Sequence, residues 1–363
     1  MKESIKNSIK EILLAPSCFP EEKRKSYETR ENELFEWYEK YGEVNTCYNL
    51  YGMDRIASPP NDEWLDRKVF RKQRHDINAM FYPPVGSFPY DYTLFMRDKD
   101  CFELLMQRIF GNSDKFVRSY GIFMNKKLYA NQSDGSRIEI SQEDLIKHFE
   151  GKRIVIKETY GASGKEVLVV SMKNGMIEDD GKRMSVNDYL LSISKSNSFF
   201  LIQDYIVQHP FMMNLNTSSV NTLRILTYNT GKQVYVANAV VRFGKSGSKI
   251  DNCDLGGNLV GTGTDGKLLG DKFNFLDKTR ESNPFQGETI PFFAQAVELA
   301  KTAHLFIPQV FTIGWDLILT ENGPKILEGN DGWEPYVSQI PQGFAQRKNW
   351  NAFLKERREY FKD

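Results

Sequence analysis

Residues 313–330, IGWDLILTENGPKILEGN, decide the fold class of this chain. Two apolar runs flank a Glu-Asn-Gly-Pro turn, a pattern that predicts a β-hairpin. The side chains of Asp316, Glu328 and Asn330 interrupt runs that otherwise consist of core residues. A carboxylate inside an apolar strand is costly unless it is paired, hydrogen-bonded or bound to a metal. Two interpretations are open: an edge hairpin with its polar groups in water, or a site for a hard divalent cation such as magnesium.

The length of the turn decides between these interpretations. A two-residue turn at 322–323 would place Asp316 on the opposite side of the sheet from the other two side chains. A three-residue loop at 321–323, in which the glycine takes a positive φ, would place Asp316 opposite Glu328. Asn330 would then lie two residues further along the same face. The metal hypothesis therefore requires the three-residue turn, or a bulge that restores the face.

Bulk composition is that of an ordinary globular protein. The 363 residues are 40% hydrophobic and 26% charged with zero formal net charge, so no overall field indicates nucleic acid or an anionic membrane as a partner. The four cysteines show no CxxC spacing, and neither a zinc site nor a disulfide framework is predicted. The apolar run at 12–15 is too short for a signal peptide, and no stretch approaches the ~20 apolar residues that span a bilayer. We expect a cytoplasmic location.

The first 97 residues are charged and prone to form helices. Residues 28–41, ETRENELFEWYEKY, carry an aromatic stripe at helical spacing, which predicts packing rather than a cofactor site. The basic run at 65–74, LDRKVFRKQR, has the composition of a nucleic-acid patch. A solvated helix face is the favoured interpretation, because nothing else in the chain supports such binding.

From residue 98 onward, strands and helices alternate without βαβ units. Asp98 is expected to cap a helix that ends at residue 110, with Lys99 in its first turn. A cation gains nothing from the helix dipole at that position, so Lys99 is either incidental or kept for a ligand. Strands are expected at 116–123, 153–157, 167–171, 199–206, 221–229 and 233–243, and helices at 142–148, 186–195 and 291–305. The sequence thus predicts an α+β fold with mostly antiparallel strands.

A glycine-bearing loop between two apolar strands is a candidate phosphate site. It consists of Gly161, Ala162, Ser163 and Gly164. Backbone N–H groups in such a loop can turn toward an anion, and Lys157 at the end of the entering strand would add positive charge. Taken alone, a simple hairpin loop is favoured, and the spacing does not match a Walker loop.

Residues 203–206, Gln-Asp-Tyr-Ile, end a buried-looking strand. A nucleotide hinge needs a free backbone N–H and C=O beside an apolar slot, and Tyr205 and Ile206 could provide both for a purine. Taken alone, an ordinary strand end is favoured.

An arginine strand and a glycine-rich loop follow. Arg224 lies between Leu223 and Ile225, where a guanidinium needs an anionic partner, and a structural carboxylate is the alternative to a ligand. Arg242 lies in the next predicted strand. The loop at 250–266, IDNCDLGGNLVGTGTDG, could close over a substrate through Asn252 and the glycine pair, with a flexible linker as the alternative.

The order of these parts resembles the ATP-grasp superfamily of ATP-dependent carboxylate–amine ligases. More narrowly, SSVNTLRILTYNTG at 218–231, the DN…GG loop and the hairpin at 313–330 resemble the sugar-transfer-associated ATP-grasp proteins, which are often encoded with surface-polysaccharide genes. The resemblance covers about 98–341, and the YGMD segment at 51–54 is similar to the N-terminal region of that subgroup. It implies two α+β lobes with antiparallel sheets that clasp ATP. The expected divisions are a helical region at 1–97, a nucleotide-lid part at 98–205, a larger part with the metal site at 206–345 and a closing helix at 346–363.

The resemblance also implies roles for individual residues. Those that match nucleotide-binding positions are Lys99 and Lys157 for the phosphates, Gly161, Ser163 and Gly164 for the lid loop, and Gln203, Tyr205 and Ile206 for the adenine hinge. Those that match the reaction centre are Arg224, Arg242 and Asn252. Those that match magnesium ligands are Asp316, Glu328 and Asn330. The chain departs from the family at the hinge, where glutamate is frequent and Gln203 stands here, and it shows no counterpart of the acidic residue that holds the ribose.

The implied activity is ligation of a carboxylate to an amine through an acyl phosphate, with ATP and Mg2+, or Mn2+ in its place. The expected partners are small-molecule carboxylate and amine substrates, with a sugar acid or an amino acid as the carboxylate, and no nucleic acid. Two other hypotheses remain: phosphotransfer to a hydroxyl group, and a non-catalytic nucleotide-binding protein of a polysaccharide assembly.

Overall fold

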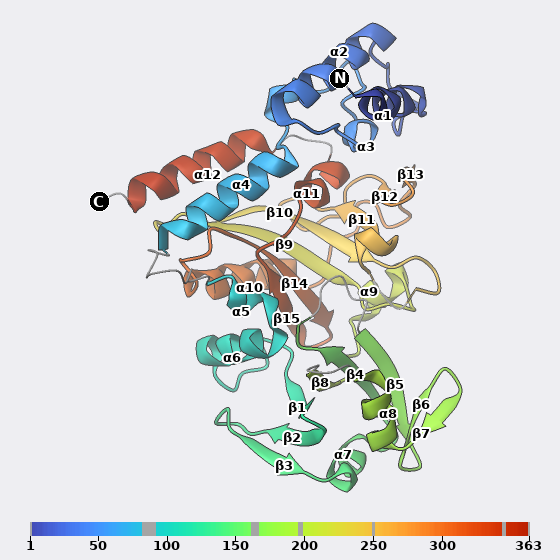
Figure 1. Cartoon of the computed structure of the whole chain (residues 1–363), viewed down its shortest axis with the longest axis vertical. Coiled ribbons are helices and arrows are strands. Elements are labelled where there is room, and N and C mark those ends of the chain that lie inside the picture. Colours follow the sequence, from blue (N-terminus) through green and yellow to red (C-terminus); the bar gives the residue numbers. More distant parts are fainter. Residues whose placement is uncertain are drawn as a thin grey trace.

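Two antiparallel β-sheets with helices packed around them form the framework of the protein (Figure 1). The computed structural model describes residues 2–81, 92–160, 167–194, 199–248, 251–342 and 346–361. The predicted loop residues Gly161, Ser163 and Gly164 lie outside these ranges. The expected α+β class, with antiparallel sheets and helices at the N-terminus, is confirmed.

The first sheet comprises, within the described residues, eight strands in the order β3-β2-β1-β8-β4-β5-β6-β7. They are β1 (Ser119–Met124), β2 (Lys127–Asn131), β3 (Arg137–Ile140), β4 (Arg153–Glu158), β5 (Val167–Lys173), β6 (Met176–Asp179), β7 (Lys182–Met184) and β8 (Phe200–Asp204). One face packs against α7 (Gln142–Phe149) and α8 (Val186–Ile193) through a core that includes Phe149, Ile156 and Leu190. Strand alternation therefore leaves Val155 and Lys157 of β4 on the opposite face.

The second sheet comprises, in the same described ranges, seven strands in the order β13-β12-β11-β10-β9-β14-β15. They are β9 (Thr222–Asn229), β10 (Val234–Phe243), β11 (Asn258–Gly261), β12 (Lys272–Asn274), β13 (Thr279–Glu281), β14 (Thr312–Thr320) and β15 (Gly323–Asn330). Leu223, Ile225 and Leu317 share a face that packs against α10 (Phe293–Leu305). Arg224 and Asp316 consequently lie on the other face.

Helices cover part of that second face. The remaining helices are α1 (Glu3–Leu14), α2 (Tyr27–Tyr41), α3 (Tyr48–Tyr51), α4 (Arg67–Asn78), α5 (Leu94–Arg97), α6 (Lys99–Phe110), α9 (Pro210–Leu215), α11 (Pro335–Gln342) and α12 (Arg347–Tyr360), with short 3₁₀ turns at Asn61–Glu63, Ala79–Phe81 and Cys253–Leu255. Helices α4 and α12 pack side by side, since the rings of Phe70 and Trp350 lie 4.9 Å apart (Figure 1). None of the helices in the described ranges combines the length and the apolar character that crossing a lipid bilayer requires.

The β14–β15 hairpin corrects the predicted turn. Thr320 pairs with Gly323, so the connection is a two-residue turn at 321–322 and not a three-residue loop. Gly323 does take a positive φ of 111°. The register shifts between Asp316 and Leu317 because Leu327 is an extra, bulged residue of β15. The bulge places Asp316 opposite Glu328, and thereby restores the shared face that the sequence argument required.

The two sheets are joined at the edge strand β15. Phe116, just before β1, forms a parallel bridge with Ile326. The N–H of Val117 donates to the carbonyl of Ile326 at 2.9 Å, and the N–H of Ile326 donates to the carbonyl of Lys115 at 2.9 Å. The start of the first sheet is thus hydrogen-bonded to the strand that carries Glu328.

Candidate functional site

A cavity of about 770 Å³ lies between the facing sides of the two sheets. Its volume is within the range of small-molecule sites in proteins. All predicted site residues in the described ranges line this one cavity: Lys99, Lys157, Gln203, Tyr205, Ile206, Arg224, Arg242, Asn252, Asp316, Glu328 and Asn330. The strand faces explain this location for those residues that lie on strands, and the chemical roles of all of them stay predictions.

One end of the cavity is an apolar slot between the sheets. Val155 and Val169 are paired across β4 and β5, and both line the cavity. Ile318 and the bulged Leu327 line it from the second sheet. A flat apolar ring system fits between two such walls.

The strand end at 204–206 borders this slot. The backbone N–H of Tyr205 donates to the carbonyl of Arg153 at 3.3 Å, and the Arg153 guanidinium lies 3.8 Å from the centre of the Tyr205 ring. In the described part of the chain, the N–H of Ile206 donates to no acceptor. Of the two predicted hinge residues, Ile206 therefore keeps a backbone donor for a ligand.

Gln203 is held in a buried network behind the slot. Its Nε2 donates to Ser119 Oγ at 3.1 Å, and Ser119 Oγ donates to Glu103 Oε2 at 2.6 Å. Burial raises the pKa of Glu103 despite the two hydrogen bonds that it accepts from Ser119. Glu103, which is not among the predicted site residues, lies on the helix that Lys99 begins.

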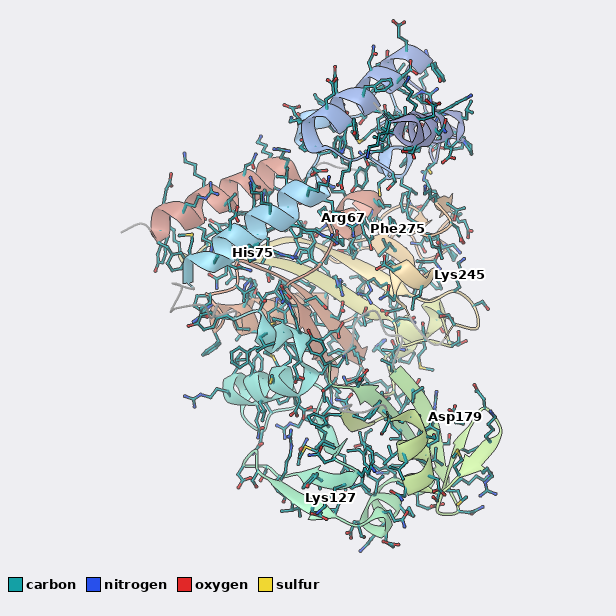
Figure 2. The ribbon with its side chains drawn as sticks, in the orientation of Figure 1. Arg67, His75, Lys127, Asp179, Lys245 and Phe275 are labelled. Carbon is teal, nitrogen blue, oxygen red and sulfur yellow. The ribbon has the colours of Figure 1, made fainter. Side chains whose placement is uncertain are left out.

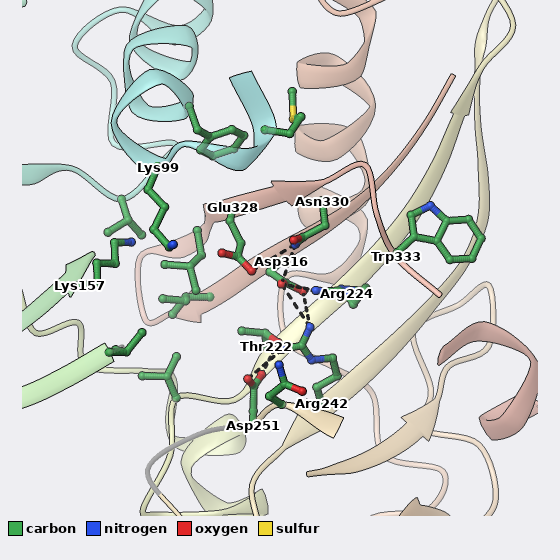
Figure 3. A pocket seen from close by; sticks show the side chains of 18 of the residues that line it. Lys99, Lys157, Thr222, Arg224, Arg242, Asp251, Asp316, Glu328, Asn330 and Trp333 are labelled. Carbon is green, nitrogen blue, oxygen red and sulfur yellow. Dashed lines mark hydrogen bonds and ion pairs between the residues drawn. The ribbon is translucent and has the colours of Figure 1, made fainter. Parts of the chain in front are cut away.

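Two lysines approach the cavity from the first sheet and α6. As expected, Asp98 caps α6, and its Oδ1 accepts hydrogen bonds from the N–H groups of Asp100 and Cys101 at 3.0 and 2.9 Å. Figure 3 shows the Lys99 and Lys157 ammonium groups directed toward the space beside Glu328. Burial lowers the pKa of Lys157 to about 8, and the charge of Lys99 acts in the same direction, whereas Glu328 opposes the shift. This end of the cavity concentrates positive charge.

The second sheet contributes a chain of alternating charges (Figure 3). Arg224 of β9 pairs directly across from Asp316 of β14, with 2.6 Å between Nε and Oδ1 and a second hydrogen bond from Nη2 to Oδ2. Arg242 Nη1 lies 3.3 Å from both oxygens of Asp316, and its Nη2 lies 2.9 Å from Asp251 Oδ1. Thr222 Oγ1 donates to the other oxygen of Asp251 at 2.5 Å.

The pKa values of the two carboxyl groups of the hairpin are shifted in opposite directions. Burial favours protonation of Asp316, but the Arg224 and Arg242 guanidinium groups outweigh it and lower the pKa of Asp316 to about 2. Burial and the Asp316 charge raise the pKa of Glu328. A carboxylate fixed in its ionised form thus lies beside one that resists ionisation, an arrangement that a bound cation would relieve.

Asn330 completes the oxygen-rich side of the hairpin. Its Nδ2 donates to Asp316 Oδ2 and to Glu328 Oε1, each at 3.2 Å. Among the residues that the structure describes, no group of three or more His, Cys, Asp or Glu side chains gathers as a metal site. Two carboxylates and one carboxamide nevertheless fit magnesium, which binds few protein oxygens and keeps water and phosphate ligands.

The loop after β10 holds Asp251, which the sequence analysis did not select. The signal was available, because a buried Arg242 needs a carboxylate and an aspartate precedes Asn252 directly. Asn252 itself lines the cavity, and its Oδ1 accepts a hydrogen bond from the N–H of Asp254 at 2.7 Å. A Cβ at Gly257 would lie 2.3 Å from the carbonyl oxygen of Asp251, so this glycine is required by close backbone packing.

Comparisons with known proteins agree with this architecture. The model of the family described as "Sugar-transfer associated ATP-grasp" matches residues 89–353. No functionally curated protein matches the sequence significantly.

Several solved structures resemble the chain at low sequence identity. D-alanine–D-alanine ligase from Bacillus anthracis is 11% identical with a TM-score of 0.37, and the match covers 73% of this chain and 67% of that protein. D-alanyl-alanine synthetase A from Vibrio cholerae O1 biovar eltor is 10% identical with a TM-score of 0.41 and coverages of 72% and 65%. An ADP complex of PurK, an N5-carboxyaminoimidazole ribonucleotide synthetase, is 11% identical with a TM-score of 0.39 and coverages of 68% and 50%.

The chain thus spans between 50% and 67% of the length of these three proteins. The family model, in contrast, extends over both sheets and every described residue that lines the cavity. The chain belongs to the sugar-transfer associated ATP-grasp family.

Proposed function

We propose that the protein is an ATP- and magnesium-dependent ligase that joins a carboxylate to an amine through an acyl phosphate. One observation carries the proposal: a single cavity presents two lysines from one side and two arginines beside an oxygen-rich hairpin from the other. In this proposal, residues 98–205 form the nucleotide-side lobe and 206–345 the lobe with the metal site. They are flanked by the helical region 1–97 and the helix at 346–363.

The nucleotide would occupy the slot and the lysine end. The valines of β4 and β5 would contact the adenine, and the backbone N–H of Ile206 would donate to a ring nitrogen. Lys99 and Lys157 would then contact the phosphates as point charges. Gly161, Ser163 and Gly164 are proposed to cover those phosphates, in line with their place between β4 and β5.

The reaction centre would lie between the lysines and the charge chain. Asp316, Glu328 and Asn330 would hold magnesium, or manganese in its place, which would supply positive charge to offset that of the phosphates. Arg224 and Arg242 would donate to the phosphoryl group in transfer, where preorganised donors stabilise developing charge. Both arginines line the cavity, and the buried Nε of Arg242 has no partner among the described residues.

The proposed chemistry needs no protein nucleophile. A substrate carboxylate oxygen attacks the γ-phosphorus of ATP, which yields an acyl phosphate and ADP. The amine then attacks the acyl carbon, the C–O bond to phosphate breaks, and inorganic phosphate and a proton leave. We further propose a sugar acid or an amino acid as the carboxylate and a role in surface-polysaccharide biosynthesis in the cytoplasm; the family description "Sugar-transfer associated ATP-grasp" supports a link to sugar chemistry.

An ADP-release screen tests the proposal. Uronic acids and amino acids are combined with a panel of amines in the presence of ATP and Mg2+, and products are identified by mass spectrometry. We expect ADP release that depends on both substrates, with an amide as product. A phosphorylated hydroxyl compound would instead assign a phosphotransferase, and the absence of any Mg2+-dependent thermal stabilisation by ATP would refute nucleotide-dependent function.

A further inference from the structure

The segment 331–334 connects the predicted metal hairpin to α11. It follows Asn330 directly, and Asp331, Gly332 and Glu334 line the cavity. It therefore links the position of a predicted metal ligand with the wall of the cavity that lies beyond the charge chain. Contacts that hold this segment in place therefore also hold the predicted metal ligand and this wall of the cavity in place.

Helix α4 contacts the segment with a row of arginines. Arg67, Arg71 and Arg74 are spaced i, i+4 and i+7, so they share one side of the helix, here called the arginine face. Arg67 Nε lies 2.8 Å from Glu334 Oε2, and Arg71 Nε donates to Glu334 Oε1 at 2.9 Å. Figure 2 places Arg67 at the end of α4 that lies toward Phe275, and His75 toward the other end.

The other end of the segment is held by two more guanidinium groups. Arg74 Nη1 donates to the backbone carbonyl of Asp331 at 2.6 Å. Arg97, the last residue of α5, donates from Nη2 to Asp331 Oδ2 at 3.0 Å. The Asp331 side chain is 6% exposed and the Arg97 side chain 47%, so the carboxylate is fixed inside while the guanidinium borders solvent.

Apolar packing locks the middle of the segment between α4 and the sheet. The rings of Phe70 and Trp333 lie 4.5 Å apart, and Trp333 Nε1 donates to Thr312 Oγ1 at 3.1 Å. A Cβ at Gly314 would lie 3.2 Å from Trp333 Cβ, so β14 and Trp333 are in close contact. Most of the basic residues of α4 are exposed, as expected for a solvated helix face, and its arginines in addition contact segment 331–334.

We propose that the arginine face of α4, together with Arg97, positions segment 331–334 and thereby sets the position of Asn330 and of the cavity wall that this segment forms. These arginines are positioning residues, because they act through Asp331 and Glu334. In this proposal, helices α4 and α5 of the N-terminal helical region support the site. The inference rests on the proposed function for its catalytic readout, but its metal-binding readout is independent of the acceptor.

The test compares Arg71→Ala and Arg74→Lys with Lys72→Ala, a matched control on the exposed side of the same helix. ADP binding is measured by calorimetry with and without Mg2+, and amine and carboxylate KM are measured where turnover is found. We expect the arginine variants to need roughly 10-fold more Mg2+ for half-maximal tightening, since supports of metal ligands typically contribute 10- to 100-fold. ADP affinity without metal should be unchanged, and Lys72→Ala should match the wild type.

A double-mutant cycle separates positioning from general stability. If Arg71 acts through Glu334, the Mg2+ requirement of Arg71→Ala/Glu334→Ala should equal that of Glu334→Ala alone, whereas independent effects would add. Arginine variants that melt earlier but retain the wild-type Mg2+ requirement and substrate KM would overturn the inference. Failure to find any acceptor would count against the proposed function alone, because the Mg2+ titration is read from ADP binding.

Discussion

Asp316 of β14 is paired with Arg224 on the neighbouring strand β9. The two side chains form a doubly hydrogen-bonded ion pair with almost no exposed surface. The carboxylate predicted to bind a metal is therefore also the counter-ion of the arginine predicted to bind phosphate. Arg224 thus has a structural carboxylate partner and also lines the cavity in which a ligand would bind, so both interpretations of this residue fit the structure. In the presence of a bound cation, this carboxylate would have to contact both the arginines and the cation.

Replacing Asp316 should cost stability as well as activity. Asp316→Asn leaves Arg224 and Arg242 without their common anion, and loss of one partner of a buried pair typically costs about 3–5 kcal/mol. We expect a loss of this order in the free energy of unfolding, measured by urea titration, together with loss of ATP turnover. Wild-type stability in this variant would contradict the ion-pair description.

Glu328→Gln should have the opposite effect on the unliganded protein. The folded-state pKa of Glu328 is raised, so the folded protein binds the proton more tightly, and wild-type stability falls as pH rises from about 4.5 through that pKa. The variant lacks this loss and should be at least as stable as the wild type at pH 7. It should also lose Mg2+-dependent tightening of ADP, and a variant that retained it would remove Glu328 from the predicted metal site.

Nucleotide affinity should depend on the charge of Lys157. Its pKa is about 8 in the unliganded protein, so ADP affinity should fall between pH 7 and pH 9 as the ammonium group loses its proton. Lys157→Met should bind weakly with a flatter profile, while Lys182→Met on exposed β7 serves as the control. Because the unfolded lysine titrates near 10.5, the unliganded protein should gain stability between pH 8 and 10.5. An identical pH profile for both variants would exclude a role for Lys157.

Asp251 should matter for turnover more than for nucleotide binding. Asp251→Asn weakens the hold on Arg242, and hydrogen bonds to charged groups contribute about 1.5–3 kcal/mol. We expect kcat/KM to fall roughly 10- to 100-fold, with ADP affinity within about twofold of the wild type. Asp277→Asn, which removes a surface pair with Lys245, is the matched control. Equal kinetics of the two variants would mean that Asp316 alone orients Arg242.

Strand alternation made many of the residues that line the cavity predictable from the sequence. Polar residues embedded in apolar runs, such as Arg224 and Asp316, mark the cavity face because each strand exposes alternate residues to it. The pairing of Asp316 with Glu328 that the metal hypothesis requires is present, and it results from the bulge and not from the three-residue turn. A bulge at Leu327 is not encoded by a turn dipeptide, so local turn rules could not distinguish it from a three-residue loop.

The features that were not predicted from the sequence depend on tertiary contacts. The basic face of α4 has the composition of a solvated helix, and only its contact with Asp331 and Glu334, more than 250 residues away in sequence, gives it a structural role. Asp251 was not selected, although Arg242, nine residues earlier in the chain, requires a carboxylate partner. Gly161, Ser163 and Gly164 lie outside the described residues, and their role as a lid stays a prediction.

The bridge between Phe116 and Ile326 gives the two sheets a common pivot. Glu328 lies two residues from this pivot on the same strand, whereas Lys157 lies on β4, separated from β1 by β8. A swing of one sheet relative to the other would therefore carry Lys157 through a longer arc than Glu328. Such a swing would change the distance from Lys157 to the hairpin, whereas Asp316, Glu328 and Asn330, which lie on the paired strands β14 and β15, would keep their mutual geometry.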